Sequence, residues 1–556
     1  MKKLYAILAI IIITLSIIII PYFTFSQTNN KETENIAVFC KMWGFLKYYH
    51  PEVAKGETDW DKEFISRINT VTSLSSKQEI SDYYMDWIKS LGKVEKCKKC
   101  DNNAQKDQNL DLSWINNEAS FSDKLIKKLN YIRENRNQGR NHYVQQNLFV
   151  GNTSYTNEKE YVDSVYPSLE LRLLSLARYW NIINYFFPYK YLTDQNWNDA
   201  LPEMIPKFKY AKDTVSYHMA IMELVGKVDD SHAIFGTKYT FEYFGYKWAP
   251  FKFKIIDNKV IVTGFYNDSL CARNDIIHGD IFLSVDNKNI EEIIAERLKY
   301  IPGSNYPTKL RNFSYAIFNG NKDSVIVTFQ RNGINHEKYL YRYTFNEFNY
   351  EYNEDSEVLS SILDNNIGYV NMGILEKDNV KQVLNSLKDT KAIIFDVRNY
   401  PKGTMYDIAN FLNKGSVPFA KFSKPDMKYP GTFKIVESYN CGTDNRDHYK
   451  GLVVVLFNEE TQSHAEFTVM ALQTAPNVIC IGSQTAGADG NVSQIVLPGN
   501  YKFYMTGIGV YYPDGRETQR IGIVPDIEVK PTLAGIIMEK DEVLEKAIEV
   551  INERTE

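Results

Sequence analysis

The sequence predicts a multidomain α/β protein, and its length together with two patterns leads to this prediction. With 556 residues the chain is too long for one hydrophobic core, so several domains are expected. An aromatic-rich motif recurs in the N-terminal part, whereas strand and helix patterns alternate from about residue 367 onward. The hydrophobic share of 44% and charged share of 24% are typical of globular proteins, and the net charge of −5 gives no reason to expect nucleic acid.

The first residues follow the pattern of an export signal. Lys2 and Lys3 precede an apolar run that continues to Ile20, and a short polar stretch follows Pro21. A basic start, an apolar middle and a polar exit are typical of a secretory signal. We favour cleavage after this stretch, but the run is long enough to stay as a membrane anchor. Residues 1–26 are therefore expected to export the protein to the periplasm or the cell exterior.

Six cysteines include one close pair, Cys97 and Cys100. An exported compartment permits a disulfide, so this pair is expected to form either a local disulfide or two free thiols. A zinc site would require two more ligands, and the sequence contains no second such pair. Neither a metal nor another cofactor is predicted.

An internal repeat marks residues 27–240 as a duplicated helical region. Residues 41–51 are echoed by 178–188 with the same Trp-to-Pro spacing, and Trp60 and Trp197 follow at the same offset. Each copy predicts a helix, a proline stop and then two further helices. A polar stretch around residues 101–147 is expected to separate the copies.

The two copies differ directly after a shared Gly-Lys-Val. The first continues with Glu95, whereas the second continues with Asp229, Asp230, Ser231 and His232. A Ser-His pair gained by one copy at a helix exit suggests that this corner faces a site, although a plain loop is the simpler interpretation. Because the chain has only 8 His, few other residues are available as a general base.

Residues 241–345 are rich in strand patterns. Residues 251–256 and 259–263 predict a hairpin, and 324–330 predict a further strand. Together with the Gly-Asp-Ile core at 279–281, this region resembles a PDZ domain, which binds extended peptide ends by adding a strand to a sheet edge. The alternative is a β-rich spacer that binds no ligand.

Residues 346–556 alternate strand and helix. Four apolar runs predict strands at 367–372, 391–397, 452–457 and 478–481. In such sheets ligands bind at the carboxyl ends of the strands, where the turn 396–403 is also placed.

Ser463 lies between the third of these strands and a segment with helical spacing. A hydroxyl at a strand-to-helix turn is surrounded by free N–H groups and the positive helix end, which suits a nucleophile. The simpler interpretation is a helix N-cap, a position that serine also favours.

In this order the pieces resemble the C-terminal-processing, or tail-specific, serine peptidases and their tricorn-core branch. The resemblance is carried by the Asp396-x-Arg398 turn, the Ser463 elbow, the segment 481–487 and the segment 513–526. It extends from roughly Leu169 to the C-terminus and implies a ClpP/crotonase-like α/β catalytic domain.

The resemblance also implies the catalytic residues. One branch uses a lysine after a Thr-x-Gly element, but 485–490 contain no lysine, so a Ser–Lys dyad is disfavoured. The tricorn-like branch uses Ser, His, a second Ser and Glu, which correspond here to Ser463, His232, Ser231 and Glu517. Without the resemblance, Glu517 is equally well interpreted as a surface charge on a hairpin.

Two backbone N–H groups are expected to form the oxyanion hole, at His464 and Gly403. Because Pro401 has no N–H, the donor within the turn 401–403 stays open.

The leading hypothesis is an exported serine peptidase that hydrolyses extended or unstructured polypeptides through an acyl-enzyme. The second is a catalytically idle protein of the same fold that binds peptides or an apolar ligand. Hydrolysis of esters or carbohydrates by the same nucleophile is a third. A polypeptide is the expected partner, nucleic acid is not, and membrane contact is expected only through an uncleaved N-terminal segment.

Overall fold

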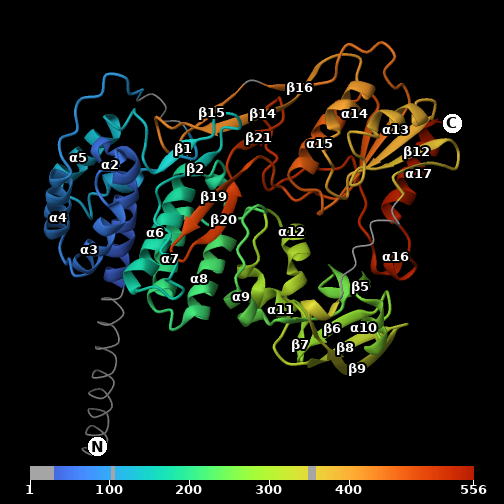
Figure 1. The fold of residues 1–556 in the computed structure, drawn as a ribbon, viewed down its shortest axis with the longest axis horizontal. Coiled ribbons are helices and arrows are strands. Elements are labelled where there is room, and N and C mark those ends of the chain that lie inside the picture. Colours follow the sequence, from blue (N-terminus) through green and yellow to red (C-terminus); the bar gives the residue numbers. More distant parts are fainter. Residues whose placement is uncertain (1–29, 102–106, 349–357, 437, 556) are drawn as a thin grey trace, which may run out of the picture.

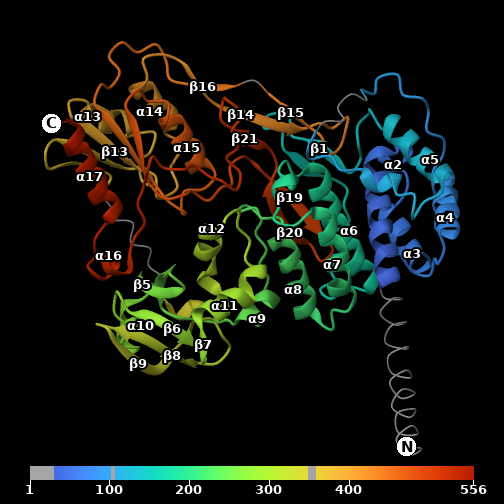
Figure 2. The ribbon, with the colours of Figure 1, turned by 180° about the vertical axis from the view of Figure 1, so that it is seen from behind.

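The computed structural model describes residues 30–101, 107–348, 358–436 and 438–555 (Figure 1). The predicted signal or anchor at 1–26 lies outside the described residues. Among those described, no helix is both long and apolar enough to span a membrane. The helical units, the β-rich region and the α/β region occupy separate parts of the molecule, as the view from behind also shows (Figure 2).

Each copy of the repeat folds as the predicted series of helices. The first consists of a helix over 30–49, α2 (Pro51–Ala54), α3 (Trp60–Thr72) and α4 (Lys77–Ser90). The second consists of α6 (Leu169–Phe186), η2 (Lys190–Leu192), α7 (Trp197–Lys209) and α8 (Thr214–Gly226).

Paired tryptophans show that the copies share their packing as well as their helices. The Trp43 indole donates to the Trp60 carbonyl at 3.0 Å, and the Trp60 indole donates back to the Trp43 carbonyl at 3.1 Å. Trp180 and Trp197 form the same reciprocal pair, at 2.8 and 3.0 Å.

The segment between the copies is more ordered than its polar sequence suggests. It contains η1 (Ser113–Asn116), α5 (Asp123–Glu134), β1 (Val144–Gln146) and β2 (Thr153–Tyr155). The amphipathic α5 buries Leu125, Leu129 and Ile132 in the helical core, so this segment packs against the copies and does not merely separate them.

The β-rich region forms an antiparallel sheet in the order β4-β5-β6-β8-β9, with β7 on β6. Its strands are β4 (Phe251–Ile256), β5 (Lys259–Phe265), β6 (Ile281–Val285), β7 (Lys288–Asn289), β8 (Ser324–Arg331) and β9 (Ile334–Tyr341). Its helices include α9 (Lys238–Phe244), α10 (Asp268–Arg273), α11 (Ile290–Arg297) and α12 (Tyr306–Arg311). The short strands β3 (Lys247–Trp248) and β10 (Tyr343–Thr344) pair beside it. Its likeness to a PDZ domain stays a prediction.

The predicted α/β architecture of the C-terminal region is confirmed. Its sheet runs in the order β11-β12-β13-β17-β18-β22, and all neighbours from β12 to β22 are parallel. The strands are β11 (Ser360–Leu363), β12 (Ile367–Asn371), β13 (Ala392–Asp396), β17 (Leu452–Phe457), β18 (Val478–Gly482) and β22 (Ile527–Glu528). Helices α13 (Val380–Leu387), α14 (Met405–Leu412) and α15 (His464–Leu472) pack on one core, and α17 (Glu542–Thr555) on another.

Two β elements of the C-terminal part reach back to the helical units. Strand β14 (Val417–Pro425) pairs with β15 (Phe433–Ile435), β16 (Tyr439–Cys441) and β21 (Gly509–Tyr511), and forms an arm between the α/β region and the helices (Figure 1). The hairpin of β19 (Val492–Leu497) and β20 (Tyr501–Thr506) lies beside α6. Its apolar side chains Ile495, Leu497, Phe503 and Met505 belong to the same core as the helices.

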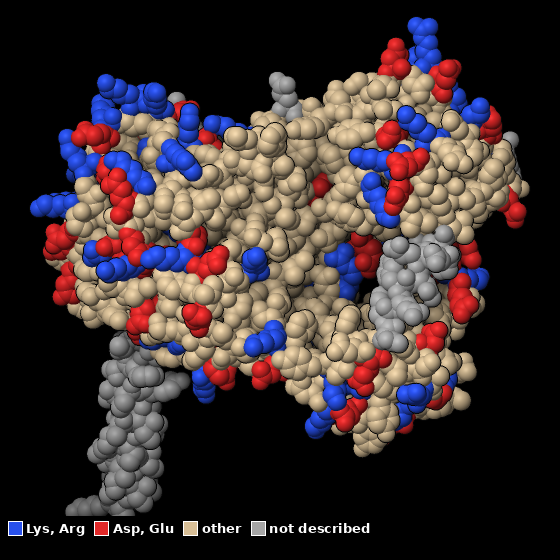
Figure 3. Space-filling model, viewed as in Figure 1, with Lys and Arg blue, Asp and Glu red and all other residues tan. Residues whose placement is uncertain are grey.

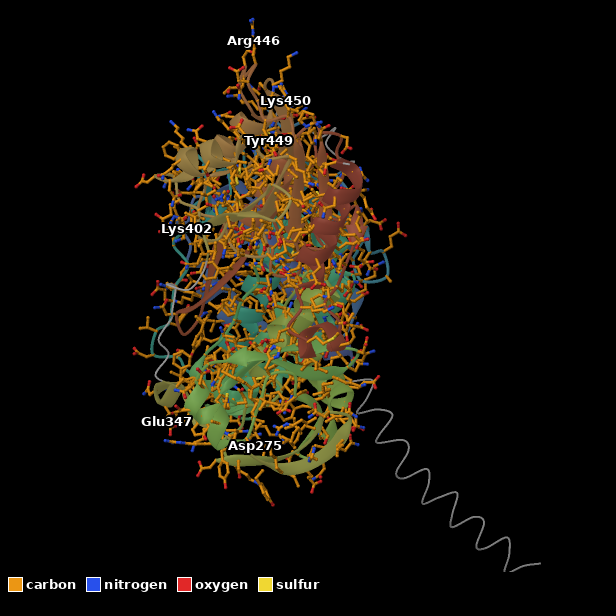
Figure 4. All side chains as sticks on the ribbon, turned by 90° about the vertical axis from the view of Figure 1, so that its right-hand side faces the viewer. Asp275, Glu347, Lys402, Arg446, Tyr449 and Lys450 are labelled. Carbon is orange, nitrogen blue, oxygen red and sulfur yellow. A yellow bond between two sulfur atoms is a disulfide. The ribbon has the colours of Figure 1, made fainter. Side chains whose placement is uncertain are left out.

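The charged side chains mark the outside of this arrangement. Lys, Arg, Asp and Glu gather over the outer lobes and are sparser over the middle of the face in Figure 3. Arg446 and Lys450, just before β17, lie at one end of the molecule, and Asp275 and Glu347 of the β-rich region lie at the other (Figure 4).

Candidate active site

Ser463 lies at the predicted strand-to-helix turn, in a strained backbone conformation. It is the N-cap of α15, with φ 58° and ψ −121°. A non-glycine residue held in such a region costs on the order of 1–3 kcal/mol, and surrounding contacts must hold it there. Here the Ser463 N–H donates to the Ala488 carbonyl at 2.9 Å and lies 3.1 Å from a Glu466 carboxylate oxygen.

Glu466 connects the nucleophile turn to the neighbouring loop. Its fully buried carboxylate accepts hydrogen bonds from the Thr485 hydroxyl at 2.5 Å, the Gly487 N–H at 2.9 Å and the Ala488 N–H at 3.1 Å. Burial raises the pKa of Glu466, and these donors partly oppose that rise. The side chain therefore fixes the 485–488 loop against the nucleophile turn.

The His232 imidazole is oriented by Thr506 and Asp230, neither of which is among the predicted site residues. Its Nδ1 lies 2.8 Å from the Thr506 hydroxyl, which donates to Asp230 Oδ1 at 2.9 Å. Because the single hydroxyl hydrogen goes to the carboxylate, the Thr506 oxygen accepts from an Nδ1–H. This network assigns the tautomer, leaving Nε2 as the proton-accepting nitrogen.

Charge and burial act on His232 in opposite directions. Burial lowers the pKa of His232, and the nearby Asp230 carboxylate partly raises it again. Asp230 is itself fully buried and also accepts from the Thr506 N–H at 2.6 Å. The imidazole is therefore neutral near pH 7, which is the form that a general base requires.

Ser463 and His232 line one cleft of about 540 Å³, although they are far apart in the sequence. The other lining residues are Tyr400, Phe422, Gln462, His464, Phe467, Asp489, Gly490, Asn491 and Val492. A hydroxyl at a helix N-terminus and a neutral imidazole that share one cleft are the parts needed for nucleophilic acyl transfer.

Comparison with known proteins agrees with this geometry. Residues 366–529 match the sequence model of Peptidase family S41. This segment, which contains the strands of the C-terminal sheet from β12 to β22 and the Ser463 turn, is therefore similar to peptidase family S41. The predicted family and the predicted serine-type peptidase class are thereby confirmed.

Two solved structures share the fold. Mature CPAF complexed with lactacystin is 14% identical, with a TM-score of 0.53 over 69% of this chain and 99% of that chain. Mature CPAF alone is likewise 14% identical with a TM-score of 0.53, over 69% and 98% of the two chains. A search of curated proteins gives no match.

The structure does not bring two of the residues implied by the S41 resemblance into this cleft. The Ser231 hydroxyl donates to the Ala486 carbonyl at 2.9 Å and accepts from the Ser304 N–H at 2.8 Å, so it ties loops together. Glu517 accepts from the Tyr191 hydroxyl and lines two other grooves. The acid linked to the imidazole is Asp230, through Thr506.

One signal in the sequence points to Asp230. Where the second copy of the repeat has Asp230, the first has Lys96, so the acid is gained together with His232. Its neighbour Asp229 instead pairs with Lys309 at 2.7 Å and Arg520 at 3.2 Å. No spacing rule marks Thr506, because only the packing of the β19–β20 hairpin brings it near.

The two predicted oxyanion donors differ in position. His464 is the first residue of α15 and lines the cleft, whereas Gly403 (φ 76°) does not appear among its described lining residues. From the same turn, Tyr400 lines the cleft, and the exposed Lys402 pairs with Glu376 at 3.0 Å and lies at the edge of the molecule in Figure 4. Burial and the nearby Lys377 lower the pKa of the His464 imidazole.

The Asp396-x-Arg398 motif connects two structural elements. Arg398 bonds to both Asp396 oxygens, at 2.9 and 2.6 Å, and to both Asp541 oxygens, at 2.7 Å each. It therefore joins the end of β13 to the turn before α17.

The cysteines are also placed. Cys97 and Cys100 form a disulfide with an S–S distance of 2.10 Å, and Cys40, Cys271, Cys441 and Cys480 are buried and free. Within the part of the chain that the structure describes, no three His, Cys, Asp or Glu side chains are grouped to hold a metal ion.

Proposed function

We propose that the chain is an exported serine endopeptidase that cleaves extended polypeptides through an acyl-enzyme, with Ser463 as nucleophile and His232 as base. The single observation that carries the proposal is the shared cleft, where the strained Ser463 turn meets an imidazole held with Nε2 as acceptor. Export rests on the signal pattern of residues 1–26.

In the proposed reaction, the Ser463 oxygen attacks the scissile carbonyl carbon while its proton passes to His232 Nε2. The oxyanion accepts hydrogen bonds from the His464 N–H and from a donor of the 401–403 turn, where Gly403 is the proposed residue. The C–N bond then breaks as Nε2 returns the proton to the leaving amine. A water molecule deacylates the enzyme by the same proton transfers.

Asp230 and Thr506 have positioning roles in this scheme. The carboxylate stabilises the imidazolium that forms at each transfer, and the hydroxyl holds the ring in place. Ser231 and Glu517 are assigned supporting roles outside the reacting atoms, since their side chains bond to loops and to Tyr191 respectively.

The β-rich region, proposed here as a PDZ-like domain at 241–345, supports an extended substrate. Strand β9 is last in the sheet order, and Ile334, Tyr339 and Tyr341 on it are 63%, 65% and 54% exposed. An edge strand that exposes apolar side chains such as these three can pair with another extended chain. Arg311 links this region to the active site, donating to the Glu459 carbonyl at 2.6 Å and to Gln462 at 2.8 Å.

Two assays test the proposal together. In the first, the intact enzyme is treated with a fluorescent fluorophosphonate. In the second, the enzyme is incubated with a substrate protein in its chemically unfolded form and, separately, in its folded form. We expect labelling at Ser463, none in Ser463→Ala, and digestion of the unfolded substrate alone. If the correctly folded enzyme is not labelled and digests neither substrate, the hypothesis of a catalytically idle binding protein is favoured.

A further inference from the structure

Asp489 is a buried acid in the cleft of the nucleophile, and only one of its two carboxylate oxygens accepts a hydrogen bond from the described chain. Its side chain is 4% exposed, yet the residue lines the same cleft as Ser463 and His232. Oδ1 accepts from the Gly490 N–H at 2.6 Å, whereas the buried Oδ2 has no hydrogen-bond partner in the described chain. An unpaired buried carboxylate oxygen costs free energy unless a ligand donates to it.

The charges around Asp489 leave a place for a cation. Asp489 makes no ion pair with any described residue, and Glu466, whose charge acts on it, is already hydrogen-bonded by its own donors. Burial, reinforced by Glu466, holds the pKa of Asp489 well above its ordinary value. A positive group placed at Oδ2 would offset both effects.

The rest of the cleft suits a long side chain that ends in such a group. Tyr400, Phe422 and Phe467 supply aromatic surface, and none of the described residues that line the cleft is a lysine or arginine. Aromatic faces accommodate an aliphatic stem and attract a cation. The Ser463 N–H bonds to Ala488, so Asp489 follows directly the residue that touches the nucleophile.

We propose that Asp489 binds the side chain of a lysine or arginine adjacent to the scissile bond, which makes the enzyme selective for basic residues. This rests on the proposed peptidase function. The ammonium or guanidinium donates to Oδ2, while the stem lies against the aromatic lining. Norleucine, which keeps the stem of lysine without its charge, leaves Oδ2 unpaired.

The test uses N-acetylated fluorogenic peptides that differ only in lysine or norleucine, placed on either side of the cleavable bond. Acetylation excludes a terminal ammonium as the cation. We expect kcat/KM for lysine to exceed that for norleucine by ~10- to 100-fold at one of the two positions, the range for a hydrogen bond to a charged group. Asp489→Asn should reduce this ratio towards one. Asp514→Asn, at an exposed aspartate, should preserve it.

The result separates this inference from the proposed function. Equal cleavage of lysine and norleucine peptides by the wild type, or an unchanged ratio in Asp489→Asn, would overturn the role of Asp489 while leaving the peptidase intact. If Asp489→Asn does not fold, inhibition of the wild type by matched peptidyl-lysinal and peptidyl-norleucinal decides. If no peptide is cleaved, binding of both peptides to Ser463→Ala by fluorescence anisotropy still tests the preference.

Discussion

Replacement of Thr506 by valine tests how His232 is oriented. Valine keeps the shape of threonine but removes the hydroxyl that lies 2.8 Å from His232 Nδ1 and donates to Asp230 at 2.9 Å. The Asp230 carboxylate keeps its hydrogen bonds from the backbone N–H groups of Thr506 and His232, at 2.6 and 3.1 Å, so its position is retained. The variant therefore removes the link between acid and imidazole without removing either group.

The expected loss follows from the charge on that link. When His232 takes up a proton, the imidazolium donates to the Thr506 hydroxyl, which in turn donates to the Asp230 carboxylate. A hydrogen bond to a charged group contributes about 1.5–3 kcal/mol. Thr506→Val should thus lower kcat by ~10- to 150-fold. KM should change little, because Thr506 is not among the residues that line the cleft.

The assay is steady-state hydrolysis of a short chromogenic peptide across pH, with thermal unfolding measured in parallel. Thr506→Ser keeps the hydroxyl and should recover most of the rate. Equal rates in Thr506→Val and Thr506→Ser, with both folded, would refute the relay. A loss of activity that tracks only a loss of stability would do the same.

Four further predictions concern the mechanism, the charges and the substrate. Because burial lowers the pKa of His232, wild-type activity should rise with pH through a midpoint below 6.5. Asp230→Asn removes the carboxylate charge that opposes this shift, so it should move the midpoint lower still and reduce the rate at high pH. A midpoint that rises in Asp230→Asn would contradict the interaction between Asp230 and His232. Ser463→Ala should abolish turnover while the unfolding temperature stays near that of the wild type, and retained turnover would exclude Ser463 as nucleophile. Arg398→Ala removes the ion pairs of the buried Asp396 and the partly exposed Asp541 and should lower the free energy of unfolding by about 2–4 kcal/mol, somewhat less than for a fully buried pair. Arg516→Ala, which breaks an exposed pair, should cost far less, and similar losses in denaturant titrations would contradict this. Tyr339→Lys on the exposed edge of β9 should raise KM for a long unfolded substrate more than for a short peptide. Equal effects on both substrates would show that the edge of β9 does not bind the substrate.

The strands of the C-terminal sheet and the position of Ser463 could be predicted, because they depend on residues that are close together in the sequence. The apolar runs at 452–457 and 478–481 have no polar alternation, which fits strands buried on both faces, and the structure has β17 and β18 there. Ser463 follows the first of these runs and precedes a helical pattern, so its place at the turn could be predicted. The repeat predicts the paired tryptophans only as equivalent positions, and the reciprocal hydrogen bonds appear once the helices pack.

The surroundings of the nucleophile could not be predicted in the same way. Thr506 reaches His232 on the β19–β20 hairpin, which leaves its own domain and packs on another, and no short-range pattern encodes that docking. Glu517 is expected as the catalytic carboxylate only through the family resemblance. The structure instead gives it the Tyr191 hydroxyl as a partner, in a different groove.

The shared core of the helical units and the β19–β20 hairpin gives the enzyme an order of assembly. His232 is made early in synthesis, but the hydroxyl that orients it belongs to Thr506, close to the end of the chain. On the proposed mechanism, a chain whose synthesis has not yet reached Thr506 lacks an oriented base even after its N-terminal helices have folded. On the same mechanism, the relay is complete only after the β19–β20 hairpin has packed on the helical units, so hydrolysis would wait for that step of folding.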